Sequence, residues 1–94
     1  MALYLISYDI KSYDKKEYPE LYAKLEEIQA ERILFSEWIV IADSGKANVI
    51  YDKIAPCIKM PDRLLVQELT KGAQWDKLLM SDDRFRQFLA HARG

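Results

Sequence analysis

The sequence has almost none of the residue types that build disulfide frameworks, zinc sites and histidine chemistry. Its 94 residues include one cysteine, Cys57, and one histidine, His91. One cysteine cannot form an intramolecular disulfide or a zinc site made of several thiolates, and one histidine cannot form a two-histidine metal motif. The sequence also contains no phosphate-binding loop and no dinucleotide-binding fingerprint. A carboxylate is therefore the metal ligand that this composition leaves.

Glycine and proline are also scarce, with three residues of each. Hydrophobic residues make up 50% of the chain and charged residues 31%, which excludes disorder, collagen-like repeats and low-complexity sequence. The length and composition predict a single folded domain over residues 1–94. The formal net charge of −1 supplies no general attraction to nucleic acid.

Long apolar runs and a basic leader are missing as well. Residues 1–6 are apolar, but no basic segment precedes them and Asp9 interrupts the run early. We therefore expect a cytoplasmic protein with no membrane association, in which a single reduced cysteine is ordinary. The alternative is a secreted dimer joined through Cys57.

The first third of the chain predicts a strand and then a helix. Residues 2–10 alternate between two faces, one of them apolar as far as Ile10 and the other polar from Ser7. A polar loop follows over residues 11–17, and Pro19 suits the first turn of a helix over 18–30. The apolar stripe of this helix contains Tyr18, Leu21, Tyr22, Leu25 and Ile28.

The middle of the chain predicts a hairpin, a second helix and a further strand. Residues 32–36 and 38–43 are rich in β-branched and aromatic residues and favour two strands joined by a tight turn, with one long strand bulged at Ser36 as the alternative. Asp43 or Ser44 can cap the second helix, and the last strand spans 64–70. The apolar stripe of the second helix contains Ala47, Ile50, Tyr51, Ile54 and Ile58.

This β-α-β-β-α-β order predicts an α+β protein of the ferredoxin-like class. Such a core, over about residues 2–70, has a four-stranded antiparallel sheet with two helices on one face. A helical tail over about residues 74–92 carries two apolar pieces, one around Trp75 and one around Phe88. We expect this tail to pack either on the open face of the sheet or on a partner subunit.

Asp9 is the principal candidate for catalysis and for metal binding. It ends a buried strand, so its carboxylate lies at the rim of the sheet, where it can bind a hard cation such as Mg²⁺ or Mn²⁺. One carboxylate does not make a firm site, but two copies across a dimer axis would supply a pair whose metal-bound water could attack a phosphodiester. The alternative is a structural role, in which Asp9 accepts hydrogen bonds from loop N–H groups.

A basic group follows Asp9 directly and is the candidate nucleic-acid-binding segment. Lys11, Lys15 and Lys16 surround Tyr13, and lysines beside an aromatic ring suit a phosphate backbone with a stacked base. The alternative is a solvated loop, because acidic residues interrupt the run. We expect His91 to face solvent or a satisfied partner, and Cys57 to be a small buried residue.

Two segments resemble the small CRISPR-associated protein two family. Leu-Tyr-Leu-Ile-Ser-Tyr-Asp-Ile over residues 3–10 is similar to the first strand of that family, which ends in a Tyr-Asp or similar pair. Leu-Phe-Ser-Glu-Trp-Ile-Val over residues 34–40 resembles the second and third strands of its SinR-like relatives. The similarity covers roughly residues 2–70.

The resemblance implies a ferredoxin-like fold and a homodimer in which the two Asp9 side chains face each other. It implies a nucleic-acid-associated scaffold or regulator that binds nucleic acid or a protein partner. The alternative that it implies is an endonuclease dependent on Mg²⁺ or Mn²⁺, acting on RNA or DNA through the Asp9 pair. A ribonuclease toxin similar to the VapD proteins is a special case of this alternative.

Overall fold

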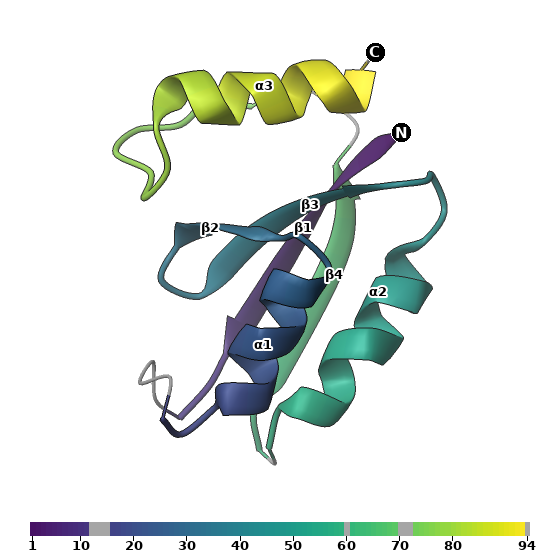
Figure 1. The fold of residues 1–94 in the computed structure, drawn as a ribbon, viewed down its shortest axis with the longest axis vertical. Helices are drawn as coiled ribbons and strands as arrows, with labels where there is room; N and C mark the ends of the chain where they lie inside the picture. Colours follow the sequence, from purple (N-terminus) through teal and green to yellow (C-terminus); the bar gives the residue numbers. More distant parts are fainter. Residues whose placement is uncertain (12–15, 60, 70–72, 94) are drawn as a thin grey trace.

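The computed structural model describes residues 1–11, 16–59, 61–69 and 73–93, and places seven longer elements and one short 3-10 turn along the chain (Figure 1). These elements are β1 (Ala2–Asp9), α1 (Pro19–Glu27), β2 (Glu31–Leu34), β3 (Glu37–Ala42), α2 (Ala47–Ile54), the 3-10 turn η1 (Ala55–Cys57), β4 (Arg63–Leu69) and α3 (Asp82–Arg93). The described part of the chain contains no helix with the length and hydrophobicity of a membrane span.

The four strands form one antiparallel sheet in the order β2-β3-β1-β4. The predicted α+β class with a four-stranded antiparallel sheet is therefore confirmed. β1 is central because its side chains are apolar on both faces over most of its length, and such a strand needs a neighbour at each edge and cover on each face. Leu5 illustrates this position, since it lies opposite Ile39 of β3 and Gln67 of β4.

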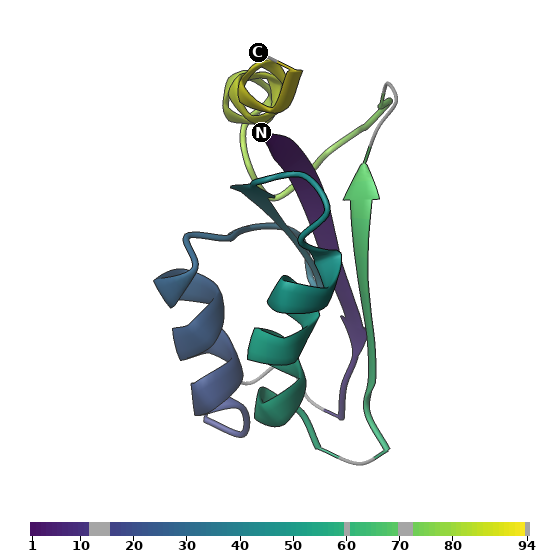
Figure 2. The same cartoon turned by 90° about the vertical axis from the view of Figure 1, so that its right-hand side faces the viewer.

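One face of the sheet is covered by α1 and α2, which lie side by side (Figure 2). The even-numbered residues of β1 point into this layer, and Tyr4 and Ile6 are fully buried. Tyr8 is buried there as well, and the hydroxyl groups of Tyr4 and Tyr8 have hydrogen-bond partners. Trp38 Nε1, for example, donates a 2.7 Å hydrogen bond to the Tyr8 hydroxyl, as a buried indole N–H requires.

The opposite face is partly covered by α3, near the start of β1 (Figures 1 and 2). Leu3 and Ile39 of the sheet pack there against Phe85 and Phe88 of α3 in a second apolar cluster. Of the two placements expected for the tail, the open sheet face is therefore the one that α3 occupies.

The prediction that the whole tail is helical is wrong for its first piece. Residues 73–81 are irregular and the helix begins only at Asp82. Lys77 has a left-handed φ of 56°, and the Leu79 N–H donates a 2.8 Å hydrogen bond to the Ile33 carbonyl of β2. Leu79 therefore contacts the edge strand β2, while other residues of the segment, including Trp75, pack against the second apolar cluster. Ser81 caps this helix, since its hydroxyl accepts a hydrogen bond from the Arg84 N–H at 3.1 Å.

The two-strand hairpin prediction is confirmed, with Ser36 in the tight turn between β2 and β3. The first helix is shorter than the predicted 18–30, because Gln29 adopts a left-handed φ of 65° and Ala30 N–H bonds back to the Leu25 carbonyl. The end of the predicted last strand, Thr70, lies outside the described residues.

The predicted cap of the second helix is wrong, because neither Asp43 nor Ser44 caps α2 through its side chain. The backbone N–H groups before this helix use partners from distant strands. Gly45 N–H donates to Glu68 of β4 at 2.8 Å, and Lys46 N–H donates to the hydroxyl of Tyr4 at 2.8 Å. The left-handed φ of 75° at Gly45 makes this turn a glycine position.

Candidate functional site

Asp9 lies at the end of β1, as predicted, and its carboxylate is 68% exposed. The antiparallel register places Arg63, the first residue of β4, directly opposite. Arg63 Nη1 lies 3.2 Å from Asp9 Oδ2, so the two side chains form an exposed ion pair. The structural alternative for Asp9 was a set of hydrogen bonds from loop N–H groups. The partner found within the described residues is a guanidinium group instead.

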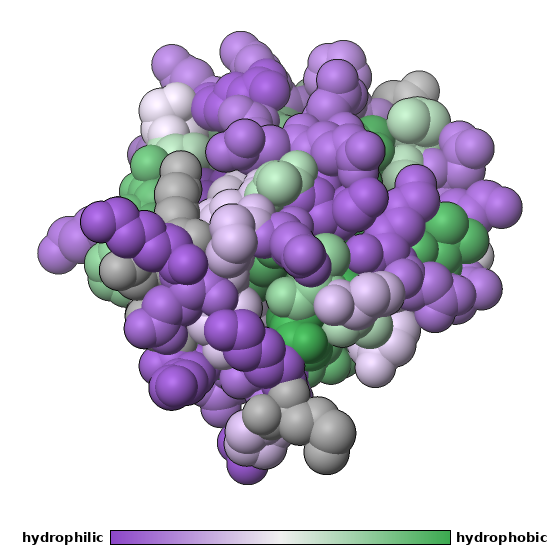
Figure 3. Space-filling view, turned by 60° about the horizontal axis from the view of Figure 1, so that its bottom comes forward, coloured by the Kyte–Doolittle hydropathy of each residue, from purple (hydrophilic) through white to green (hydrophobic). Residues whose placement is uncertain are grey.

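Asp9 and Arg63 line a hollow of about 480 Å³, which we call the β1 hollow. Its other charged or polar lining residues are Lys11, Tyr18, Lys59 and Asp62, with Ile10 and Pro61 completing the wall. It lies at the end of the molecule where the space-filling view shows mostly hydrophilic side chains around a small apolar area (Figure 3). Among the described residues, three cations and two carboxylates thus line this opening, with a combined charge of +1.

Tyr18 connects the segments of the β1 hollow. Only 1% of this residue is exposed, and its hydroxyl donates to Asp62 Oδ2 at 2.8 Å and accepts from the Lys11 backbone N–H at 3.2 Å. Burial, and next the hydrogen bond to the Asp62 carboxylate, raise the pKa of the Tyr18 phenol. The phenol therefore remains protonated and keeps its donor role at neutral pH.

Lys59 is held over the same tyrosine. Its Nζ lies 4.6 Å from the centre of the Tyr18 ring and donates to the Glu17 carbonyl at 2.9 Å. Its backbone N–H donates to Asp62 Oδ2 at 2.8 Å. The ammonium group is therefore positioned by an aromatic face and a carbonyl while it retains a further donor for a ligand.

The structure brings one of the three predicted lysines into this site. Lys11 lines the β1 hollow, whereas Lys16 is exposed in the turn before α1. Lys15 and the neighbouring Tyr13 lie outside the described residues. The lysine that lies against an aromatic ring at this site is a different one, Lys59, whose partner is Tyr18.

The carboxylates of the β1 hollow limit the metal chemistry of a single chain. Asp9 is paired with Arg63, and Asp62 accepts hydrogen bonds from Tyr18 and Lys59. No group of three or more His, Cys, Asp or Glu side chains within the described residues is placed to hold a metal ion. A cation at Asp9 would have to displace Arg63 or obtain ligands from another molecule.

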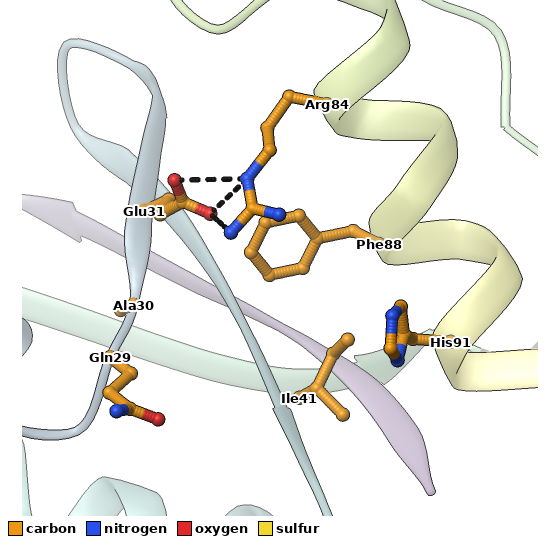
Figure 4. Close-up of a pocket in the computed structure, with 7 residues that line it drawn as sticks. All are labelled: Gln29, Ala30, Glu31, Ile41, Arg84, Phe88 and His91. Carbon is orange, nitrogen blue, oxygen red and sulfur yellow. Dashed lines mark hydrogen bonds and ion pairs between the residues drawn. The ribbon is translucent and has the colours of Figure 1, made fainter.

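A second hollow, of about 500 Å³, lies between α3 and the start of β2 (Figure 4). Arg84 forms a two-pronged ion pair with Glu31, with contacts of 2.7 and 2.9 Å to one carboxylate oxygen. The same guanidinium lies 4.8 Å from the Phe88 ring centre. Because these charges are paired with each other, we interpret this arrangement as the attachment of α3 to β2.

Two minor expectations have different outcomes. His91 is exposed on α3, at the border of the second hollow, which agrees with a solvent-facing histidine. Cys57 is only half-buried, which corrects its interpretation as a buried residue, because it lies in η1 at the surface end of α2. Burial of its thiol still raises the Cys57 pKa, so the reactive thiolate is disfavoured.

The sequence reasoning missed Arg63, Lys59 and Asp62 as site residues. A signal for Arg63 was present, because a residue that begins a strand antiparallel to β1 can lie beside the residue that ends β1. Lys59 and Asp62 carried no such signal, since their positions depend on how the segment after η1 packs against Tyr18.

Comparisons with known proteins add no assignment to this site. No known protein-family model matches the chain, and no curated protein matches it significantly.

Proposed function

We propose that this protein is a dimeric nucleic-acid-associated scaffold or regulator that binds phosphate groups at the β1 hollow. The observation that carries the proposal is the convergence of Lys11, Lys59 and Arg63, from three separate segments, on one opening. Cationic side chains that line a recess supply the phosphate contacts on which nucleic-acid affinity depends.

The local chemistry favours binding over cleavage. Among the described residues, the Asp9 carboxylate contacts the Arg63 guanidinium group, and the Asp62 carboxylate already accepts from two donors. A phosphate oxygen can replace the Asp9 carboxylate as the partner of Arg63, because guanidinium groups bind both anions in the same two-pronged manner. Such an exchange requires no metal ion.

The ferredoxin-like arrangement is part of this proposal. Its support is the sheet order β2-β3-β1-β4, in which each helix connection skips one strand, together with the position of α1 and α2 on one face. The resemblance to the CRISPR-associated protein two family, with its homodimers and nucleic-acid partners, is consistent with this arrangement. The homodimer and the cytoplasmic location belong to the proposal as well.

Fluorescence anisotropy with labelled single-stranded RNA and DNA tests the binding function. The wild-type protein should bind saturably in EDTA, and the Lys59→Ala, Arg63→Ala double variant should bind at least tenfold more weakly. The Lys46→Ala, Lys53→Ala double variant, which removes two cations outside the β1 hollow, is the matched control and should bind like the wild type. Equal affinity of the two double variants would refute the proposed site.

The second candidate is an endonuclease dependent on Mg²⁺ or Mn²⁺, including a ribonuclease toxin similar to VapD. The observation in its favour is the exposure of Asp9 at the end of β1, where a second copy could bring another carboxylate. Incubating labelled RNA and DNA with Mn²⁺ and resolving the products on a gel tests this candidate. Metal-dependent products that disappear in Asp9→Asn would favour the nuclease, whereas intact oligonucleotides would favour the scaffold.

A further inference from the structure

The two edges of the sheet differ in how well they are protected from another strand. β2, at one edge, has four residues, a shifted register between Arg32 and Leu34, and a hydrogen bond from Leu79 N–H to its Ile33 carbonyl. Short length, irregular register and cover by another segment are features that prevent pairing with a further strand. β2 is therefore a protected edge.

β4, at the other edge, lacks these protections. It has seven residues in regular register with β1, and no proline or lysine interrupts it. Its two charged side chains bond within their own subunit, since Arg63 pairs with Asp9 and Glu68 accepts hydrogen bonds from Tyr4 and Gly45. The views of the fold show β4 bordering the sheet with no strand beyond it among the described residues (Figures 1 and 2). Such an edge is a template for strand addition.

The middle of this edge also carries an exposed apolar side chain. Leu65 is 53% exposed on the sheet face opposite α1 and α2, beyond the part that α3 covers. Tyr51, 44% exposed on α2, provides further apolar surface on the helix side. On α2, Tyr51 and Lys53 lie on opposite sides of the apolar stripe, and Lys53 faces α1. Tyr51 therefore lies on the side of α2 away from α1, and α2 itself packs against β4.

We propose that a second copy of this chain adds to β4 in antiparallel register, with a two-fold axis at Leu65. In this register Leu65 lies beside its own copy on one face, and Leu64 lies opposite Val66 of the partner subunit on the other. An axis at Val66 would place the charged Glu68 opposite Leu64 of the partner subunit. An axis at Gln67 would place Glu68 opposite Val66 of the partner subunit. Because the apolar residues at the centre of β4 match their own copies, they favour a second copy of this chain as the partner and Leu65 as the position of the axis.

This interface deepens the homodimer of the proposed function and rests on that part alone. Joining the sheets through β4 separates the two Asp9 residues by three strand-to-strand spacings and by an offset of four residues along the strands. Strand spacing and rise place these carboxylates roughly 20 Å apart. They could not share one metal ion in this dimer, so the interface agrees with the scaffold and opposes the Asp9-pair nuclease.

Sedimentation equilibrium without nucleic acid tests the interface. Leu65→Lys should raise the dimer dissociation constant by at least about 100-fold, because two buried leucines become two adjacent ammonium groups. Leu79→Lys is the matched control, since Leu79 is also 53% exposed but lies away from β4. It should leave the dimer unchanged, and circular dichroism should show that both variants are folded.

Disulfide cross-linking then tests the register, in a Cys57→Ser background that removes the native thiol. Leu65→Cys should cross-link its two copies under mild oxidation, because directly opposed Cβ atoms lie near disulfide distance. Gln67→Cys should not, since its two copies would be four residues out of register. A monomeric wild type, a dimer that survives Leu65→Lys, or cross-linking by Gln67→Cys in place of Leu65→Cys would each overturn the proposal. A wild-type protein that dimerises through β4 but binds no nucleic acid would count against the proposed function alone.

Discussion

Replacing Asp9 by asparagine should strengthen nucleic-acid binding rather than weaken it. The substitution keeps the shape of the side chain and removes its charge beside Arg63, with which it forms a 3.2 Å ion pair. A phosphate held by Arg63 would lie about 8 Å from the Asp9 carboxylate, where two unit charges in water repel by roughly 0.5 kcal/mol. The affinity should therefore rise about twofold.

The cost in folding stability should be small. Both partners of this ion pair are largely exposed, with 83% of the Arg63 side chain and 68% of the Asp9 side chain accessible. Exposed ion pairs contribute about 0–1 kcal/mol to the free energy of unfolding. Urea unfolding should therefore place Asp9→Asn within about 1 kcal/mol of the wild type.

Anisotropy titrations of labelled single-stranded RNA, with EDTA and with Mg²⁺, measure the change in affinity. Asp83→Asn is the matched control, because Asp83 is also an exposed aspartate paired with an arginine, Arg86, but lies on α3. The two variants have the same net charge, so a gain confined to Asp9→Asn locates the effect at the β1 hollow. Weaker binding by Asp9→Asn, or loss of a Mg²⁺-dependent contribution, would refute this reasoning and favour a metal site.

Three further predictions concern the scaffold around the site. Tyr4→Phe removes the buried hydroxyl that accepts from Lys46 N–H, and should lower the free energy of unfolding by about 1–3 kcal/mol in urea; a loss below about 0.5 kcal/mol would contradict this. Hydrogen bonds from the Gly45 N–H, and next from the Tyr4 hydroxyl, lower the pKa of Glu68 in the folded state. The ionised Glu68 therefore stabilises the fold above its unfolded pKa, and this stabilisation is lost as the pH falls through the folded pKa. Glu68→Gln should therefore flatten the fall in melting temperature below about pH 4.5, and an unchanged acid limb would refute this. Phe88→Ala should lower the free energy of unfolding by about 3–5 kcal/mol in thermal or urea unfolding. Leu79→Ala, at an exposed residue, should lower it by less than about 0.5 kcal/mol. Similar losses in the two variants would show that α3 is not part of the core.

Sequence periodicity predicted the strands and helices whose apolar residues recur at regular spacing. It failed where backbone N–H groups bond to residues far away in the sequence. The alternating pattern of β1 and the stripes of the first two helices were sufficient to place those elements. The cap of α2 was mispredicted because the N–H groups of Gly45 and Lys46, just before the helix, bond to strand residues that are far away in the sequence. Trp75 shows a similar failure, since helical spacing there reflects packing of an irregular segment onto the second apolar cluster.

The candidate site was only partly predictable for the same reason. Asp9 and Lys11 could be identified because they follow a buried strand directly along the chain. Arg63 and Lys59 join them through strand pairing and through packing on Tyr18, which are tertiary effects. Without these partners Asp9 resembled a metal ligand, whereas the guanidinium beside it now favours anion binding.

The salt dependence of binding tests the role of the β1 hollow most directly. Each phosphate contact to a single strand contributes about 0.7 to the slope of log affinity against log salt concentration. The Lys59→Ala, Arg63→Ala double variant should therefore lower the magnitude of this slope by about 1.4 relative to the wild type in KCl titrations of single-stranded RNA. A double variant with the wild-type slope would contradict phosphate binding at this site.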